Sequence, residues 1–260
     1  MTGPRIIADD FGLCEKHDNV IIELIKHKKI NAVSVMVHPD LKSSSRIDLL
    51  KVEKNLTIGL HLNFTIHLPN NKITNTSSRL LLNNFILKNN NKIIIQNIQY
   101  QINLFEEIFD KFPDFIDGHE HIHIFPNIFS ALTEILTARP LPRDFWVRSP
   151  APSTLSDLYR EYQNAGIKVI IISFFGIIAR KKLKSLNLKS NMNFFGFLKL
   201  NTTSKNFEKI YNKNLSLLKN NVTLMVHPGD AESLVYIKGH SNKIRALEAE
   251  ILKNSEINLR

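Results

Sequence analysis

The sequence predicts an α/β protein whose parallel strands form a (β/α) barrel, either short of the eight strands of a TIM barrel or distorted from it. Three features predict this fold. Short β-branched runs recur along the 260 residues, segments with helical periodicity separate them, and the runs are almost continuously apolar. Strands of this composition are typical of parallel sheets covered by helices on both faces. A doubly wound open sheet is the alternative, although no Gly-rich phosphate loop follows the first run.

About seven strands are expected, at 5–9, 32–37, 56–64, 115–121, 144–148, 168–174 and 222–227. The first helix follows the first strand, because apolar residues between Val20 and Ile25 recur on one helical face. Further helices are expected near 97–111, 127–138, 155–165, 204–219 and 241–253.

Two polar stretches, 68–92 and 179–205, fit neither pattern and are expected to be surface excursions. Long loops on an α/β scaffold often form lids or substrate-binding walls. No repeat or linker divides the chain, so residues 1–260 are interpreted as one domain.

Composition excludes several classes of protein. With 43% hydrophobic and 22% charged residues, the chain is not disordered as a whole. The net charge of +10 would suit a nucleic-acid partner, but the basic residues are scattered, and the longest basic cluster, 179–184, has no aromatic platform. Hence no nucleic-acid partner is expected. The single cysteine excludes an internal disulfide and a zinc site made of cysteines alone.

The chain shows neither a secretory leader pattern at its start nor an apolar run long enough to span a membrane. The longest such run, 169–179, is well short of the ~20 residues that a span needs. We expect a cytoplasmic protein without stable membrane insertion, and we leave open whether it is a homodimer.

The residues capable of chemistry gather where strands are expected to end. In a parallel barrel all strand ends share one rim, where active sites are built. The residues at that rim would be Asp9, Asp10, His61, His119, His121, Arg148 and His227.

Each of these residues also has a purely structural explanation. The Asp pair could cap a helix, a lone histidine could be hydrogen-bonded in the core, and Arg148 could hold a surface carboxylate. Five strand ends would then have to coincide by chance, which favours a functional site. His17, His38 and His240 follow no pattern and are expected to be solvated.

The stretch "FIDGHEHIHIFP" places three histidines at alternate positions. In an extended strand alternate residues share a face, so Asp117, His119 and His121 are expected to point into the barrel mouth. One would bind an ion, and the others would orient it or contact substrate. Two imidazoles and one carboxylate suit zinc or iron, and a water-rich shell would allow magnesium or manganese.

Four motifs at these residues resemble the YdjC family of carbohydrate deacetylases, whose best-known type is a chitooligosaccharide deacetylase. They are "ADDFG" at 8–12, "GLHLN" at 59–63, "DGHEHIHIFP" at 117–126 and "HPG" at 227–229. Weaker similarity extends to 194–200 and 245–252, so the resemblance covers nearly the whole chain.

The resemblance implies a barrel-like fold and a metal-dependent hydrolase that removes an acetyl group from an N-acetylated sugar or oligosaccharide. It also implies that Asp10, His61 and His119 bind the metal and that Asp9 is the catalytic base. Magnesium is the ion usually associated with the family, and zinc would also fit these ligands.

The chemistry then assigns the remaining residues. His227 is the candidate acid for the leaving amine, Arg148 would stabilise the intermediate or hold Asp9, and His121 would contact substrate. A metal-dependent phosphoesterase and a non-catalytic sugar-binding module on the same fold are the alternatives. The sequence does not choose between a chitin fragment, an envelope glycan and a lipid-linked sugar.

Overall fold

The computed structural model describes residues 5–66, 91–199, 202–219, 221–235, 237 and 240–259. Its centre is an eight-stranded sheet with the order β6-β5-β4-β3-β2-β1-β8-β7, in which every neighbouring pair is parallel. The strands are β1 (Arg5–Phe11), β2 (Ala32–Val35), β3 (Thr57–Leu62), β4 (Phe115–Gly118), β5 (Trp146–Val147), β6 (Lys189–Ser190), β7 (Asn193–Phe195) and β8 (Val222–Val226).

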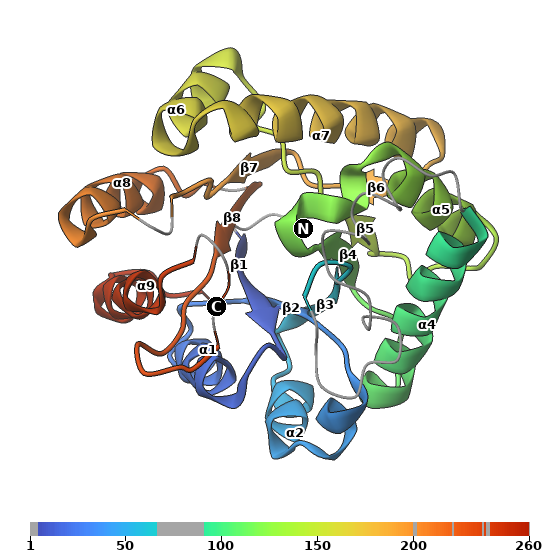
Figure 1. Cartoon of the computed structure of the whole chain (residues 1–260), viewed down its shortest axis with the longest axis horizontal. Coiled ribbons are helices and arrows are strands. Elements are labelled where there is room, and N and C mark those ends of the chain that lie inside the picture. The colour runs from blue at the N-terminus through green and yellow to red at the C-terminus, as the bar shows by residue number, and fades with distance from the viewer. Residues whose placement is uncertain are drawn as a thin grey trace.

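Helices surround the curled sheet on its outer side (Figure 1). They are α1 (Glu15–Lys26), α2 (Ser45–Val52), α4 (Asn91–Phe109), α5 (Pro126–Thr137), α6 (Leu155–Ala165), α7 (Ile167–Ser185), α8 (Ser204–Ser216) and α9 (Asn242–Asn254), with 3-10 helices η1 (Pro39–Ser43) and η2 (His119–Ile124). The predicted fold class, a distorted (β/α) barrel, is confirmed.

The barrel is open on one side, between β6 and β7. These two strands are the ends of the sheet, and within the described residues no ladder joins them. Only Asn191 and Met192 lie between them in the chain. The Asn191 side chain accepts the Ser149 backbone N–H at 2.6 Å and donates to the Ser149 carbonyl at 2.9 Å, which ties the crossing to the end of β5.

The apolar core has two parts. The larger part lies between the sheet and its helices and includes Ala8, Val33 and Leu60, all fully buried. The smaller part plugs the interior of the barrel near the starts of the strands, where Phe115 stacks on Trp146 at 4.7 Å. Because that end is filled, a site inside the barrel has room only toward the carboxyl ends of the strands.

One predicted strand is wrong. Residues 168–174 lie in α7, a 19-residue helix that begins after Gly166 and ends at Ser185. A continuous apolar run has no period that separates a buried strand from a helix with apolar residues on all sides. The stretch 179–205 is also not one surface excursion, because it contains the end of α7 together with β6 and β7.

The other predicted excursion, 68–92, lies outside the described residues except for its last two, which begin α4. Within the described part of the chain, no helix combines the length and apolar character needed to cross a bilayer.

Candidate metal centre and active site

The end of β1 brings two consecutive aspartates into one site. Neighbouring residues of a regular strand point to opposite faces. Here the register with β2 shifts between Ala8 and Phe11, and Asp10 has a left-handed backbone with φ of 68°. Gly12 completes the bend, because a Cβ there would lie 2.4 Å from the Met36 carbonyl oxygen. Asp9 and Asp10 can therefore both face the barrel mouth.

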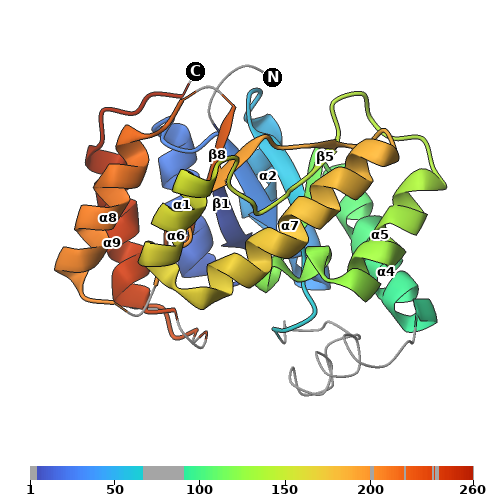
Figure 2. The ribbon, with the colours of Figure 1, turned by 90° about the horizontal axis from the view of Figure 1, so that it is seen from above.

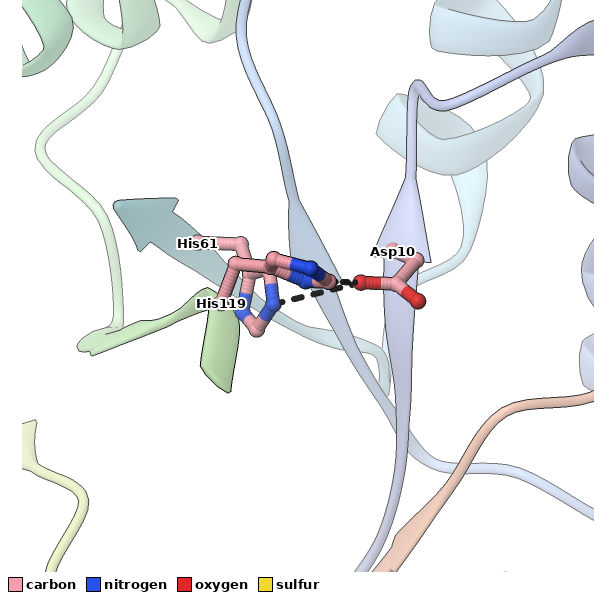
Figure 3. A group of neighbouring side chains, drawn as sticks. All are labelled: Asp10, His61 and His119. Atoms are coloured by element: carbon pink, nitrogen blue, oxygen red, sulfur yellow. Dashed lines mark hydrogen bonds and ion pairs between the residues drawn. The ribbon is translucent and has the colours of Figure 1, made fainter. Parts of the chain in front are cut away.

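Asp10, His61 and His119 lie together, although they come from β1, β3 and the first residue of η2 (Figure 3). The Oδ1 atom of Asp10 is 2.9 Å from Nδ1 of His119 and 3.4 Å from Nε2 of His61. All three side chains are buried, and one candidate ligand atom from each lies within 4.8 Å of the others. The residues expected to bind a metal are close enough to share one ion.

Asp117 orients His61 for this role. The Oδ1 atom of Asp117 is 2.7 Å from Nδ1 of His61, which leaves Nε2 to face Asp10. Such a carboxylate fixes the tautomer and ring orientation of a metal-binding histidine. Burial opposes a charge on the ring, but the carboxylates of Asp117 and Asp9 outweigh it and raise the pKa of His61 to about 10. The surroundings of His61 therefore favour positive charge.

Arg148 lies behind Asp9, fully buried. Its Nη1 and Nη2 atoms donate to the two oxygens of Asp9, each at 2.7 Å, and Nη1 is 3.0 Å from Oδ2 of Asp117. Asp9, His61 and Asp117 form a second group that could hold a cation. Since the guanidinium already neutralises both of its carboxylates, the group that contains Asp10 is the better metal site.

Two residues that the sequence analysis did not assign complete the surroundings of Asp10. Nη2 of Arg245, on α9, lies 2.5 Å from Oδ2 of Asp10 and 3.0 Å from Nδ1 of His240. Burial by itself would raise the pKa of Asp10, but His119 and Arg245 hold it well below its usual value. Arg245 begins the weaker family block 245–252, which was the one signal available in the sequence.

The histidines of "HEHIH" do not continue a strand, which corrects the expectation of a shared face. β4 ends at Gly118, and the next residues turn sharply, with φ of 52° at Glu120 and 59° at His121. The turn separates the rings. His119 faces Asp10, whereas Nε2 of His123 lies 2.7 Å from the Arg148 backbone carbonyl and is structural.

The His121 ring follows a third direction. It contacts Phe194 and Phe197 edge-on, at centroid distances of 5.8 and 5.4 Å, and it lines the central cavity. Burial lowers the pKa of His121 well below its usual value, and the charge of Arg148 adds to this effect. A neutral imidazole at this place can hydrogen-bond a sugar hydroxyl without carrying charge.

His227 follows β8 on the opposite side of the barrel mouth. Its backbone N–H donates to Oε2 of Glu248 at 2.6 Å, and burial lowers the pKa of its ring well below the usual value. The "HPG" turn also contacts His17, because a Cβ on Gly229 would lie 2.5 Å from Nδ1 of that ring. His17 is thus buried, contrary to the expectation of a solvated side chain.

His38 and His240 were also expected to be solvated. His38 is buried, with Nε2 at 3.1 Å from the Gly12 carbonyl oxygen, and His240 is half-buried beside His119 and His227.

These residues surround a cavity of about 510 Å³ at the carboxyl end of the sheet. Ligand cavities commonly measure about 300–1,000 Å³, so one or two sugar rings fit this volume. One side is polar and includes Asp9, His61, His119, His121, His227 and His240. The facing wall is largely apolar and includes Val169, Ile171 and Ile172 of α7, with Lys168 and Lys199 also lining the cavity.

The sequence profile of the YdjC-like proteins matches residues 5–258. The chain belongs to the YdjC-like family. Its fold is similar to that of a crystal structure from Enterococcus faecalis V583, a protein to which cellobiose-phosphate cleavage has been ascribed. The two superpose with a TM-score of 0.59 at 16% identity, over 97% of this chain and 91% of the other.

Several named proteins are more similar in sequence. The chitooligosaccharide deacetylase of Proteus mirabilis is 27% identical over 141 residues, 52% of this chain and 55% of that protein. The carbohydrate deacetylase of Xenopus laevis is 24% identical over 189 residues, 64% of this chain and 60% of that protein. The chain thus spans little more than half the length of these relatives.

Proposed function

We propose that this YdjC-like protein is a divalent-metal-dependent carbohydrate N-deacetylase. It would hydrolyse the acetamide of an N-acetylated sugar or oligosaccharide to acetate and a free amine. The observation that carries the proposal is the buried group of Asp10, His61 and His119 on the polar side of a sugar-sized cavity, next to Asp9. The names of the related proteins support the same reaction.

The residues present fit a divalent cation. Asp10 offers an oxygen, His61 and His119 offer imidazole nitrogens, and Asp117 supports His61 from behind. These donors suit zinc, and the family resemblance favours magnesium with water completing its shell. When bound, the cation would polarise the amide carbonyl and lower the pKa of a water molecule.

Asp9 is the proposed proton acceptor. Burial outweighs the charge of Arg148 and raises the pKa of the Asp9 carboxyl, which suits proton transfer nearer neutral pH. Arg148 holds both carboxylate oxygens, so it is proposed as a positioning residue. The oxygen of the water molecule forms a bond to the carbonyl carbon of the acetyl group, and a proton of the same water molecule passes to Asp9.

His227 is the proposed proton donor to the leaving nitrogen. The C–N bond breaks as that nitrogen gains a proton, which leaves acetate and an amine. Because burial lowers the pKa of His227, its ring is neutral at rest near neutral pH. The ring would take up a proton from solvent as negative charge develops on the tetrahedral intermediate, and it would pass that proton to the nitrogen, while Asp9 returns the proton of the water to solvent. His121, with its ring on the cavity wall, is proposed to contact the sugar.

The test is acetate release from a panel of soluble N-acetylated mono- and oligosaccharides, with and without a chelator. We expect release that the chelator abolishes and that added metal restores. His61→Ala should lose both metal binding and release, whereas His27→Ala, a half-exposed histidine at the end of α1, should retain both. Hydrolysis of phosphoesters without acetate release would instead favour the phosphoesterase alternative, and sugar binding without any hydrolysis would favour a binding module.

A further inference from the structure

Helix α7 exposes large apolar side chains on its outer face. Ile167, Ile170, Ile171, Phe174, Ile177 and Ile178 are each between 38% and 66% exposed. The spacing of three and four residues places them in one stripe along the helix. Leu155, Tyr159 and Tyr162 extend it onto α6, which lies beside α7 on the outer edge of the molecule (Figure 2). Contiguous exposed apolar surface of this kind marks an interaction site rather than ordinary protein surface.

The inner face of α7 packs both large and small residues against the barrel. Val169 and Leu183 are fully buried there, together with Ser173, Gly176 and Ala179. Gly176 lets the helix pack closely, because a Cβ there would lie 3.1 Å from the Ala151 side chain. A surface helix normally buries its large apolar residues and exposes its polar ones. Because α7 carries large apolar residues on its exposed face as well as on its buried one, we expect the outer face to be covered in the working protein.

The apolar stripe is continuous with the wall of the active-site cavity. Ile171 belongs to both, since it is 49% exposed and also lines the cavity, and Ile172 and Val169 line the cavity beside it. A partner that covers the stripe would therefore lie at the cavity edge. The aliphatic part of the wall, formed by Val169, Ile171 and Ile172, also suits an apolar part of a substrate.

Positive charge borders the stripe. Lys168 lies at one end and Lys181, Lys182 and Lys184 at the other, all exposed. Within the described part of the chain none of the four is paired with a carboxylate. The acidic residues of α6 and α7 do not offset them, because Glu161 is buried and Asp157 is paired with Arg160.

We infer that the α6–α7 face rests on an anionic membrane surface and that the cavity takes an N-acetylated sugar carried by a lipid in that membrane. The substrate class rests on the proposed function. An apolar helical face with lysines at its border and aromatic side chains nearby is the arrangement of helices that lie in a lipid interface. A second copy of this chain suits the surface less well, because a two-fold contact would bring the unpaired lysines of two chains with net charge +10 together.

Vesicle flotation with the whole chain tests the docking surface. We expect binding to phosphatidylcholine vesicles that contain phosphatidylglycerol and weak binding to phosphatidylcholine alone. Phe174→Asp should lower binding at least about tenfold, because the variant lacks an aromatic side chain that would be buried in the lipid when the protein is bound. Lys181→Gln with Lys182→Gln should lower it about five-fold for each lysine.

Val52→Asp is the matched control, since Val52 is 69% exposed on α2, on the other side of the barrel, and this variant should bind like the wild type. The inference is overturned when the wild-type protein binds neither vesicle, or when Val52→Asp lowers binding as much as Phe174→Asp. It is also overturned when the wild-type protein does not bind vesicles but forms a dimer, and Phe174→Asp dissociates that dimer.

A second measurement separates this inference from the proposed function. Phe174→Asp should release acetate from a soluble N-acetylated oligosaccharide at the wild-type rate, and from an N-acetylglucosaminyl lipid in vesicles at least about tenfold more slowly. Failure of the proposed function would abolish acetate release from both substrates while vesicle binding persists. Failure of the inference would leave both rates equal in wild type and variant.

Discussion

Replacement of Asp9 by Asn tests the proposed proton acceptor. In the structure the carboxylate is only 2% exposed and receives two hydrogen bonds of 2.7 Å from Arg148. Asparagine keeps the shape but has no basic oxygen, and its amide nitrogen would donate toward a guanidinium that also donates. Loss of a general base lowers kcat by about 10²–10⁴-fold. Loss of one charge-assisted bond costs about 1.5–3 kcal/mol, which a domain with ordinary stability of about 5–15 kcal/mol survives.

Metal binding distinguishes a lost base from a lost ligand. Because Asp9 is outside the group of Asp10, His61 and His119, the metal Kd of Asp9→Asn should change little. Calorimetric titration gives the Kd, and acetate release gives kcat on the same sample. Asp114→Asn is the matched control, since Asp114 is ion-paired with Lys111 at 2.8 Å but precedes β4 at the opposite end of the barrel. It should leave both quantities unchanged.

Two results would refute this reasoning. If Asp9→Asn turns over at a rate close to that of the wild type, the proton acceptor is another group. If the variant loses metal and activity together, Asp9 is a ligand, and the cation is held by the second group, which contains Asp117.

Three further predictions concern residues around the site and in the fold. His227→Gln should lower kcat by about 10²–10⁴-fold with metal Kd unchanged, and loss of metal in a calorimetric titration would make His227 a ligand. Asp117→Asn should weaken metal binding by about 10–100-fold through the orientation of His61, so an unchanged Kd would argue against that support. Glu161→Gln should flatten the pH dependence of stability. Burial outweighs two backbone N–H donors and raises the pKa of Glu161 to about 7 from 4.5, so the folded state holds the proton more tightly than the unfolded chain. The protonated Glu161 side chain therefore stabilises the folded state by about 3 kcal/mol, at ~1.4 kcal/mol for each unit of pKa difference. This stabilisation is present below pH 4.5 and is lost as the pH rises to about 7. Denaturant unfolding of wild type and variant across this range measures the effect, and equal profiles would contradict it.

The candidate metal site could be anticipated because its residues stand at chain positions with strong local signals. Asp10 and His61 each follow or end an apolar run, and in a parallel barrel all such ends meet at one rim. Arg148 also ends an apolar run and was expected to stabilise the intermediate or to hold Asp9, whereas Arg245 lies on α9 and follows no strand. Arg148 contacts Asp9 across 139 residues, and Arg245 contacts Asp10 across 235 residues. Contacts between such distant positions depend on how the sheet curls.

The wrong strand at 168–174 shows the same limit in the fold. A continuous apolar run predicts a segment that is buried on all sides. In the structure α7 packs only one face against the barrel and leaves the other exposed. Local sequence does not contain the information about what covers the outer face. The "HEHIH" turn is a second case, because alternation predicts a strand until the left-handed residues Glu120 and His121 end it.

The sequence by itself determined the alternation of strands and helices, the family and the residue types that gather at the barrel rim, because each depends on local pattern and on residue order. The tertiary structure alone decided that Arg245 neutralises Asp10 and that α7 exposes a stripe of large apolar side chains on its outer face. The physical reason is that side-chain direction and charge pairing depend on packing between segments far apart in the chain. Such packing leaves no periodic pattern of residues in a single sequence.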